Sequence, residues 1–171
     1  PQFILTSATI SNPRELAEKL IEQKCELIDE DTSPGGRRNF ILYNPPIVDP
    51  ELGLRRSASS ESVRLAGDLL AYRVQTILFA RARRSVEMIL RAMHDRYPAE
   101  SEAVHGYRSG YLAGERRSIE RGLRSGAIRT VVATSALELG IDIGSMDASI
   151  VVGYPGTLAS LRQQIGRAGR R

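Results

Sequence analysis

Residues 133–142 read Ala-Thr-Ser-Ala-Leu-Glu-Leu-Gly-Ile-Asp, and residues 163–171 read Gln-Gln-Ile-Gly-Arg-Ala-Gly-Arg-Arg. The first segment overlaps residues 128–134, a β-branched run that is typical of a strand buried on both faces of a parallel sheet. Ligands of such sheets bind at the carboxyl ends of the strands, where Thr134 and Ser135 lie. In the second segment glycines alternate with arginines, so bare backbone brings permanent cations close to an anion. The sequence therefore predicts a phosphate-binding edge.

Arginines near a chain end are often only a solvated tail, and the spacing of the two segments favours the functional interpretation. Gln-x-x-Gly-Arg-x-Gly-Arg follows a strand, a loop and Gly-Ile-Asp by about 20 residues, and such context is what supports a motif match. The chain resembles the superfamily 2 (DEAD/DEAH-box) helicases, in which residues 134–142 are similar to motif V and residues 163–170 to motif VI. The resemblance implies a RecA-like α/β domain.

The composition is that of a globular protein with a basic surface. The chain has 171 residues, 42% of them hydrophobic, and 24 Lys+Arg against 20 Asp+Glu, for a net charge of +4. Nearly all the basic residues are arginine, which favours nucleotide or nucleic-acid partners. The lone Cys25 excludes an internal disulfide and is expected to be a small buried hydrophobe. No apolar run approaches the ~20 residues of a membrane span, so we expect no membrane partner and a cytoplasmic, or in bacteria nucleoid-associated, protein.

The amino-terminal part of the chain is expected to contribute short strands and one helix. Residues 3–6, 26–28 and 40–43 each have the pattern of a short buried strand. Asn12 is expected to cap a helix whose first residue is Pro13, with Glu15 completing a capping box. The segment Ser7-Ala8-Thr9 resembles helicase motif III, which couples the nucleotide site to the nucleic-acid groove.

An acidic pair, Asp29-Glu30, follows the second of these strands and could be mistaken for a magnesium-binding helicase motif. In the family that motif precedes Ser-Ala-Thr, whereas this pair comes after it, so we interpret the pair as a solvated turn. His94 and His105 have no further ligand at a suitable spacing, and the sequence predicts no metal site.

The sequence predicts that the chain has three parts, which are the end of one lobe, a linker and a second lobe. Residues 1–46 are the expected carboxyl-terminal end of a first RecA-like lobe, and residues 47–60, which mix Pro, Gly and Ser, are an expected linker. Residues 61–171 are the expected second lobe, truncated at its end, and we expect the chain to be a piece of a longer protein. In this lobe strands at residues 76–79, 104–107, 128–134 and 148–153 alternate with helices, which predicts a parallel sheet with helices on both faces.

The helices of the second lobe have recognisable ends. Ser59 or Ser60 is expected to cap the first helix, and Gly126 to end the helix around residues 115–123. The strand at residues 76–79 runs into Ala80-Arg81-Ala82-Arg83-Arg84, which looks like motif IV, although arginines in a first helical turn are ordinarily just solvated.

The similarity narrows to the YprA/MrfA-type DNA repair helicases, a branch related to RecQ. It rests on segments spread over the whole chain: Ser33-Pro34-Gly35, Tyr43-Asn44-Pro45-Pro46, Arg56-Ser57, Phe79-Ala80-Arg81, residues 107–112, residues 136–144 and residues 153–157. Three positions depart from the pattern: Ser109 stands where glycine is expected, Ser135 where asparagine is usual, and Arg162 where tryptophan is common.

The resemblance implies an ATP-driven, 3′ to 5′ translocase on single-stranded DNA, with Mg²⁺ as the metal of the nucleotide. It assigns two arginine fingers for the γ-phosphate, Arg167 and Arg170. It assigns further nucleotide contacts to Gly140, Asp142, Gln163 and Gly166. It assigns the nucleic-acid contacts to Phe79, Arg81, Arg83, Arg108, Gly110, Thr134 and Ser135. It assigns the coupling role to Ser7 and Thr9.

What the sequence lacks limits what the chain does alone. There is no Gly-x-x-x-x-Gly-Lys-Ser/Thr segment to hold the β- and γ-phosphates, and no convincing magnesium carboxylate. We therefore expect the first lobe to be the main protein partner and the chain alone to be inactive. Two alternatives remain open, a degenerate lobe that only binds DNA or a protein, and a translocase that moves on RNA or on duplex without unwinding it.

Overall fold

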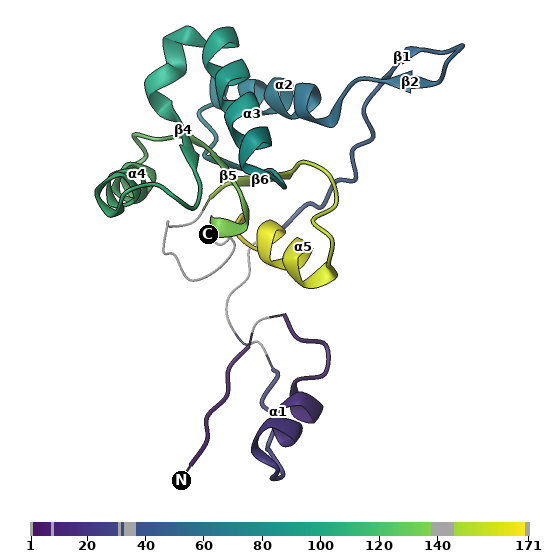
Figure 1. Cartoon of the computed structure of the whole chain (residues 1–171), viewed down its shortest axis with the longest axis vertical. Coiled ribbons are helices and arrows are strands. Elements are labelled where there is room, and N and C mark those ends of the chain that lie inside the picture. Colours follow the sequence, from purple (N-terminus) through teal and green to yellow (C-terminus); the bar gives the residue numbers. More distant parts are fainter. Residues whose placement is uncertain (1, 8, 31, 33–36, 138–145, 170–171) are drawn as a thin grey trace. The chain divides into compact units, whose positions relative to one another are not determined.

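A computed structural model describes residues 2–7, 9–30, 32, 37–137 and 146–169 of the chain (Figure 1). The chain forms two compact units, Pro1–Gly35 and Gly36–Arg171. In the described residues no helix is both long and apolar enough to cross a membrane.

The first unit contains helix α1 (Pro13–Ile21), which begins with Pro13 as expected. Asn12 precedes the helix, but its side chain accepts no capping hydrogen bond and instead donates from Nδ2 to Glu15 Oε2 at 3.1 Å. Glu15 also pairs with Lys19 at 2.6 Å, so the predicted capping box is replaced by a chain of side-chain contacts on the helix surface. Cys25 is half-buried, and the acidic pair 29–30 is exposed outside any helix or strand.

The three strands predicted at residues 3–6, 26–28 and 40–43 are not formed. Their apolar side chains are largely exposed, and the extremes are Ile4 at 82%, Ile28 at 88% and Leu42 at 86%. A parallel strand takes its hydrogen bonds from neighbouring strands. No described strand pairs with these segments, so an apolar pattern alone does not produce a strand there.

The expected linker contains a hairpin, formed by β1 (Ile47–Asp49) and β2 (Leu54–Arg55). Asp49 Oδ1 accepts from the backbone nitrogens of Glu51 and Leu52, both at 3.0 Å, which closes the turn. Helix α2 (Ala58–Ala71) follows directly. Its cap is Ser57, whose hydroxyl accepts from Ser60 N at 3.1 Å, so the predicted caps were two or three residues too late.

A four-stranded parallel sheet forms the centre of the second unit, in the order β4-β5-β3-β6 (Figure 1). Its strands are β3 (Thr76–Phe79), β4 (Val104–Tyr107), β5 (Thr130–Ala133) and β6 (Ala148–Val151). The first two match the prediction, and the last two are shorter than predicted. Ile128 and Arg129 precede β5 because their nitrogens bond to Gly122 O and Ala103 O, outside the strand ladder.

Helices cover both faces of this sheet, as predicted. They are α2, α3 (Arg83–Arg96), α4 (Ala113–Ser125) and α5 (Leu158–Ile165), with short 3₁₀ turns η1 (Pro98–Ala103) and η2 (Ser135–Leu137). The strand pleat divides the core: Ile77 and Phe79 pack with residues of α4, whereas Leu78 packs with residues of α2 and α3. The connections β3–α3–β4 and β4–α4–β5 run in opposite directions across the sheet, which places right-handed crossovers on opposite faces.

The end of α4 follows the prediction. Gly126 has φ of 77°, the left-handed conformation that glycine adopts without strain, and its nitrogen bonds to Leu123 O. A domain boundary between residues 47 and 60 stays a prediction.

Candidate nucleotide and nucleic-acid site

The register of the sheet brings four strand ends to one edge. Phe79 lies level with Ala133 and with Val151, and Ala133 lies level with Tyr107. The residues that follow the strands, among them Arg81, Arg108 and Thr134, therefore leave the sheet at its carboxyl edge. This is the edge where ligands of open parallel sheets bind.

A cavity of about 230 Å³ opens at this edge, between the ends of β3 and β6 and beside α5. Three predicted contact residues, Phe79, Arg81 and Ser135, line it. Gly153, Ser160 and Gln164 also line it, and these were not predicted as site residues.

Gln164 and Ser160 form the polar wall of this cavity. Gln164 is 5% exposed, and its Nε2 donates to Ser160 Oγ at 3.1 Å. Thr157 caps helix α5, because its hydroxyl accepts from Ser160 N, and Ser149 Oγ of β6 donates to Gln164 O at 3.0 Å. Two polar residues four positions apart on a short helix were the signal in the sequence, because such residues share one face.

Two arginines near the strand ends, Arg83 and Arg108, are held by neighbouring side chains. Arg83 Nη2 donates to Ser109 Oγ at 2.8 Å. Arg108 Nε donates to Glu87 Oε1 at 2.6 Å, and its guanidinium lies 5.0 Å from the centre of the Tyr111 ring. The hydrogen bond that Arg108 donates to Glu87 raises the pKa of Arg108 above its usual value. These contacts orient two cations while leaving the remaining N–H groups of each guanidinium for a ligand.

Ser109 departs from the family pattern, and the structure gives it a role. Its hydroxyl accepts from Arg83 Nη2, so it joins the first turn of α3 to the loop after β4. The next residue, Gly110, has φ of 104°, which L side chains rarely adopt, so a glycine is required there.

Thr134 and Ser135 follow β5 directly. Thr134 is half-buried and its nitrogen donates to Tyr107 O at 3.4 Å, whereas Ser135 is exposed and begins η2. Tyr107 supports this loop through that backbone hydrogen bond, and its hydroxyl donates to Glu120 at 2.9 Å. Burial, and then Glu120, raises the pKa of Tyr107 to about 12, so the hydroxyl stays a donor at neutral pH.

Phe79 was predicted to contact nucleic acid, but its ring is only 2% exposed and lies in the core. Its backbone carbonyl accepts from Val152 N at 2.9 Å. Phe79 therefore helps to position the edge, and its contact with nucleic acid stays a prediction.

The residues similar to motif VI form a tight turn after α5, residues 166–169, which we call the motif VI turn. A Cβ at Gly166 would lie 2.8 Å from Arg162 O, so only glycine fits there without a backbone shift. Arg167 N bonds to Gln164 O, and Gly169 N bonds to Met146 O at 3.0 Å. Arg167 and Gln163 are both partly buried.

Some predicted residues cannot be placed together. Gly140, Asp142 and Arg170 lie outside the described residues. Ser7 is exposed and Thr9 is partly buried, and both belong to the first compact unit. Within the described parts of the chain, no three His, Cys, Asp or Glu residues are grouped so that they could hold a metal ion, so the chain shows no ligand set for Mg²⁺ there.

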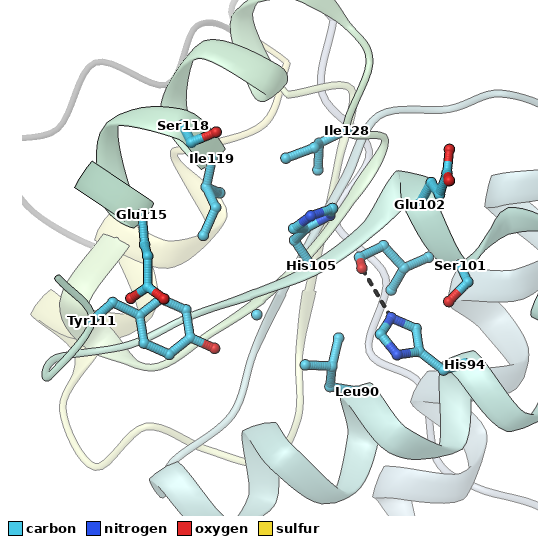
Figure 2. Close-up of a pocket in the computed structure, with 12 residues that line it drawn as sticks. Leu90, His94, Ser101, Glu102, His105, Tyr111, Glu115, Ser118, Ile119 and Ile128 are labelled. Atoms are coloured by element: carbon cyan, nitrogen blue, oxygen red, sulfur yellow. Dashed lines mark hydrogen bonds between the residues drawn. The ribbon is translucent and has the colours of Figure 1, made fainter. Parts of the chain in front are cut away.

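A larger cavity, of about 700 Å³, lies away from these residues, beside the edge strand β4 (Figure 2). His94 and His105 both line it. His94 Nε2 bonds to Val104 O at 3.0 Å, and burial, followed by the neighbouring His94, lowers the pKa of His105. Among the residues that the structure describes, none of the predicted contact residues lines this cavity, and its lining contains no arginine or lysine.

The comparisons with known proteins agree with this geometry. The family model of the helicase conserved C-terminal domain matches residues 61–171. The chain is 52% identical over 173 residues to the uncharacterised ATP-dependent helicase YprA of Bacillus subtilis, covering 100% of this chain and 23% of that protein. It is 40% identical over 178 residues to the ATP-dependent helicase hrq1 of Schizosaccharomyces pombe, covering 99% and 17%.

A solved structure gives the same result. The crystal structure of helicase MrfA bound to DNA and AMPPNP matches with a TM-score of 0.89 and 51% identity, over 96% of this chain and 23% of that one. The chain thus spans about a quarter of the length of this relative, and its sheet with helices on both faces is the helicase carboxyl-terminal RecA-like lobe. On the family match, the sheet order and the arginine-bearing edge, the chain belongs to the helicase conserved C-terminal domain family.

Proposed function

We propose that the chain is part of an ATP-dependent DNA helicase or translocase, in which it supplies nucleic-acid contacts and arginine fingers. The observation that carries the proposal is the gathering of Arg81, Arg83 and Arg108 with Thr134 at the carboxyl edge of one sheet. The names of the relatives support it, because YprA and hrq1 are described as ATP-dependent helicases and MrfA was crystallised with DNA and AMPPNP.

On the nucleic-acid side, the three arginines and the hydroxyls of Thr134 and Ser135 bind the phosphate backbone. Each guanidinium can give two parallel hydrogen bonds to one phosphate. Phosphate contacts carry no sequence information, so binding is independent of base sequence. Glu87 and Ser109 hold Arg108 and Arg83 in place before nucleic acid binds. Less side-chain conformational entropy is therefore lost on binding.

On the nucleotide side, Arg167 and Arg170 stabilise the charge that develops on the γ-phosphate of ATP. Gln163 and Asp142 complete the surface of this lobe that faces the nucleotide. ATP lies between this lobe and a first lobe that carries the phosphate loop and the Mg²⁺ ligands. Bound ATP closes the lobes, and loss of the γ-phosphate lets them reopen one step further along the strand. Ser7 and Thr9 couple the two sites.

The finer parts of the proposal are a 3′ to 5′ direction, single-stranded DNA as the track, a role in DNA repair and a cytoplasmic location. The motif resemblance to the YprA/MrfA-type helicases supports the first three. An absent phosphate loop in the sequence supports a further expectation, that the chain alone does not hydrolyse ATP.

The proposal is tested first by fluorescence anisotropy of the chain with a labelled single-stranded oligonucleotide at several salt concentrations. Three phosphate contacts predict a slope of log affinity against log salt of about −2 for a single strand, and Arg81→Ala should reduce it to about −1.4. Arg124→Ala is the matched control, because Arg124 is exposed near the end of α4 that leads to the amino end of β5. Affinity that does not change with salt, or an equal effect of both variants, would refute the DNA-binding edge.

The second measurement is phosphate release, by the chain and by the full-length protein. The chain should stay at background, whereas the full-length protein should be stimulated by single-stranded DNA. Turnover by the chain alone would reveal an unrecognised nucleotide site. A full-length protein that binds DNA without hydrolysis would be a non-catalytic module, and stronger stimulation by RNA would identify an RNA translocase.

A further inference from the structure

We propose that Arg38 is a positioning residue for the arginine fingers, and that it acts by holding the motif VI turn. This inference rests on the proposed function, because it concerns where the fingers begin. Arg38 lies far from the turn in sequence and belongs to none of the motifs identified above. In space, its Nε donates to Gly169 O at 3.1 Å, a contact that spans 131 positions.

The carbonyl that Arg38 binds belongs to the peptide group that joins Gly169 to Arg170. A peptide group is planar, so a hydrogen bond to its oxygen orients the carbonyl of Gly169 at the end of the motif VI turn. The nitrogen of Gly169 is fixed as well, because it bonds to Met146 O at 3.0 Å next to the parallel bridge between Met146 and Ala168. Both the nitrogen and the carbonyl oxygen of Gly169 are therefore held by hydrogen bonds.

Packing strengthens this contact. A Cβ at Gly169 would lie 3.0 Å from Arg38 Cγ and 3.5 Å from both Arg38 Cδ and Nε. The aliphatic part of Arg38 thus covers the glycine, whose φ of 68° already disfavours any side chain. Gly169 serves both the turn and the approach of Arg38.

The segment that carries Arg38 is itself fastened to α2. Tyr43 donates its hydroxyl to Glu61 Oε2 at 2.7 Å, and Arg56 Nη1 donates to Glu61 Oε1 at 2.7 Å. Arg64 adds a third contact at 3.0 Å, and Glu61 is only 1% exposed. The Tyr43 hydroxyl and the two arginines lower the pKa of Glu61 to about 2, so this anchor stays charged at neutral pH. Arg38 therefore reaches Gly169 from a segment that Tyr43 anchors to α2 within the same compact unit.

The experiment uses the full-length protein that contains this chain. Arg38→Met keeps the aliphatic stem and removes every donor, and Arg38→Lys keeps a charged donor. Arg37→Met is the matched control, because Arg37 is the exposed neighbour and the charge change is the same.

For Arg38→Met, we expect kcat of DNA-stimulated ATP hydrolysis to fall about tenfold, which corresponds to about 1.4 kcal/mol. KM for ATP and the half-saturating DNA concentration should stay within about twofold, since the fingers act in the transition state. Arg38→Lys should recover most of the lost kcat, and Arg37→Met should behave as wild type.

The outcomes separate this inference from the proposed function. If the wild-type protein neither binds DNA nor hydrolyses ATP, the proposed function fails. If it does both and Arg38→Met matches Arg37→Met, only the role of Arg38 is overturned. A variant that loses kcat, DNA affinity and thermal stability together, without recovery in Arg38→Lys, would show a general structural role and would also overturn the inference.

Discussion

Gly67 gives the sharpest test of the packing that supports the arginine loops. It lies on α2 against Tyr97, and a Cβ built at Gly67 would come within 2.0 Å of both Cζ and Oη of that ring. No real Cβ tolerates such a distance, so Gly67→Ala must push the ring away. Tyr97 packs against the core cluster shared by α2 and α3, and α3 begins at Arg83.

The expected magnitude follows from two opposed effects. Overpacking costs about 1 to 3 kcal/mol, and alanine in place of glycine inside a helix gains about 1 kcal/mol. The net loss in the free energy of unfolding is therefore up to about 2 kcal/mol, or up to roughly 8 °C in Tm. Thermal unfolding of the chain followed by circular dichroism measures it.

A matched control is available within the same lobe. Gly114 lies in the first turn of α4 with no atom within 4 Å of its hypothetical Cβ, so Gly114→Ala should leave Tm unchanged or raise it. In a Tyr97→Ala background the obstacle is gone, and Gly67→Ala should become neutral or stabilising. A Tm for Gly67→Ala above wild type in the presence of Tyr97, or the same change in Tm in the Tyr97→Ala background, would refute the steric reasoning.

Three further predictions address the site and its anchor. Arg167→Ala in the full-length protein should lower kcat of ATP hydrolysis by about 10³ to 10⁵ while DNA affinity is kept, and near-normal turnover in a phosphate-release assay would remove the finger assignment. Thr134→Val should raise the Kd for single-stranded DNA about 5- to 150-fold, as loss of one hydrogen bond to a charged group predicts, whereas an unchanged titration would make Thr134 purely structural. Glu61 has a lowered pKa, so its contribution to stability is complete above about pH 4.5 and is lost as pH falls towards about 2; Glu61→Gln should flatten the dependence of stability on pH in that window, and Glu100→Gln, at an exposed position, should not.

The sheet of the second unit was predictable because its central strands β3 and β5 are buried on both faces. The prediction at residues 76–79 came from an apolar run and the one at residues 104–107 from a short strand pattern before a loop, and both match the structure. The same signal failed at residues 3–6 and 40–43, where the pattern is equally apolar but no described strand offers hydrogen-bond partners. A strand forms only when it pairs with another strand, and its own residues do not identify that partner.

The helix caps show a second limit. Three serines within four residues made the start of α2 ambiguous, and Ser57 is the cap because its backbone is extended and its hydroxyl accepts from Ser60 N. Starting the helix there places Glu61 at a buried position, where Tyr43 and Arg56 meet it. Those partners lie on a different segment, so only the folded chain shows that the earliest serine must be the cap.

The position of the candidate site was predictable, and the contacts among its residues were not. Strand ends of a parallel sheet converge, which placed Thr134 at the edge, and the family resemblance added Arg83 and Arg108, whose roles stay predictions. Nothing in the sequence joins Arg108 to Glu87, which is 21 positions away, or Arg83 to Ser109, which is 26 positions away. Such contacts depend on how α3 and the loop after β4 meet in space.

These partners explain how the edge can be basic and ordered at the same time. Unpaired arginines would repel each other and lose much side-chain freedom when a phosphate bound them. Glu87 and Ser109 each take up one donor of an arginine, so the guanidinium planes are set while most of their N–H groups remain available. Because both strand faces are filled by apolar side chains, the carboxyl edge is where this chain gathers such groups. The core therefore sets the position of the site, and polar contacts between loops set its geometry.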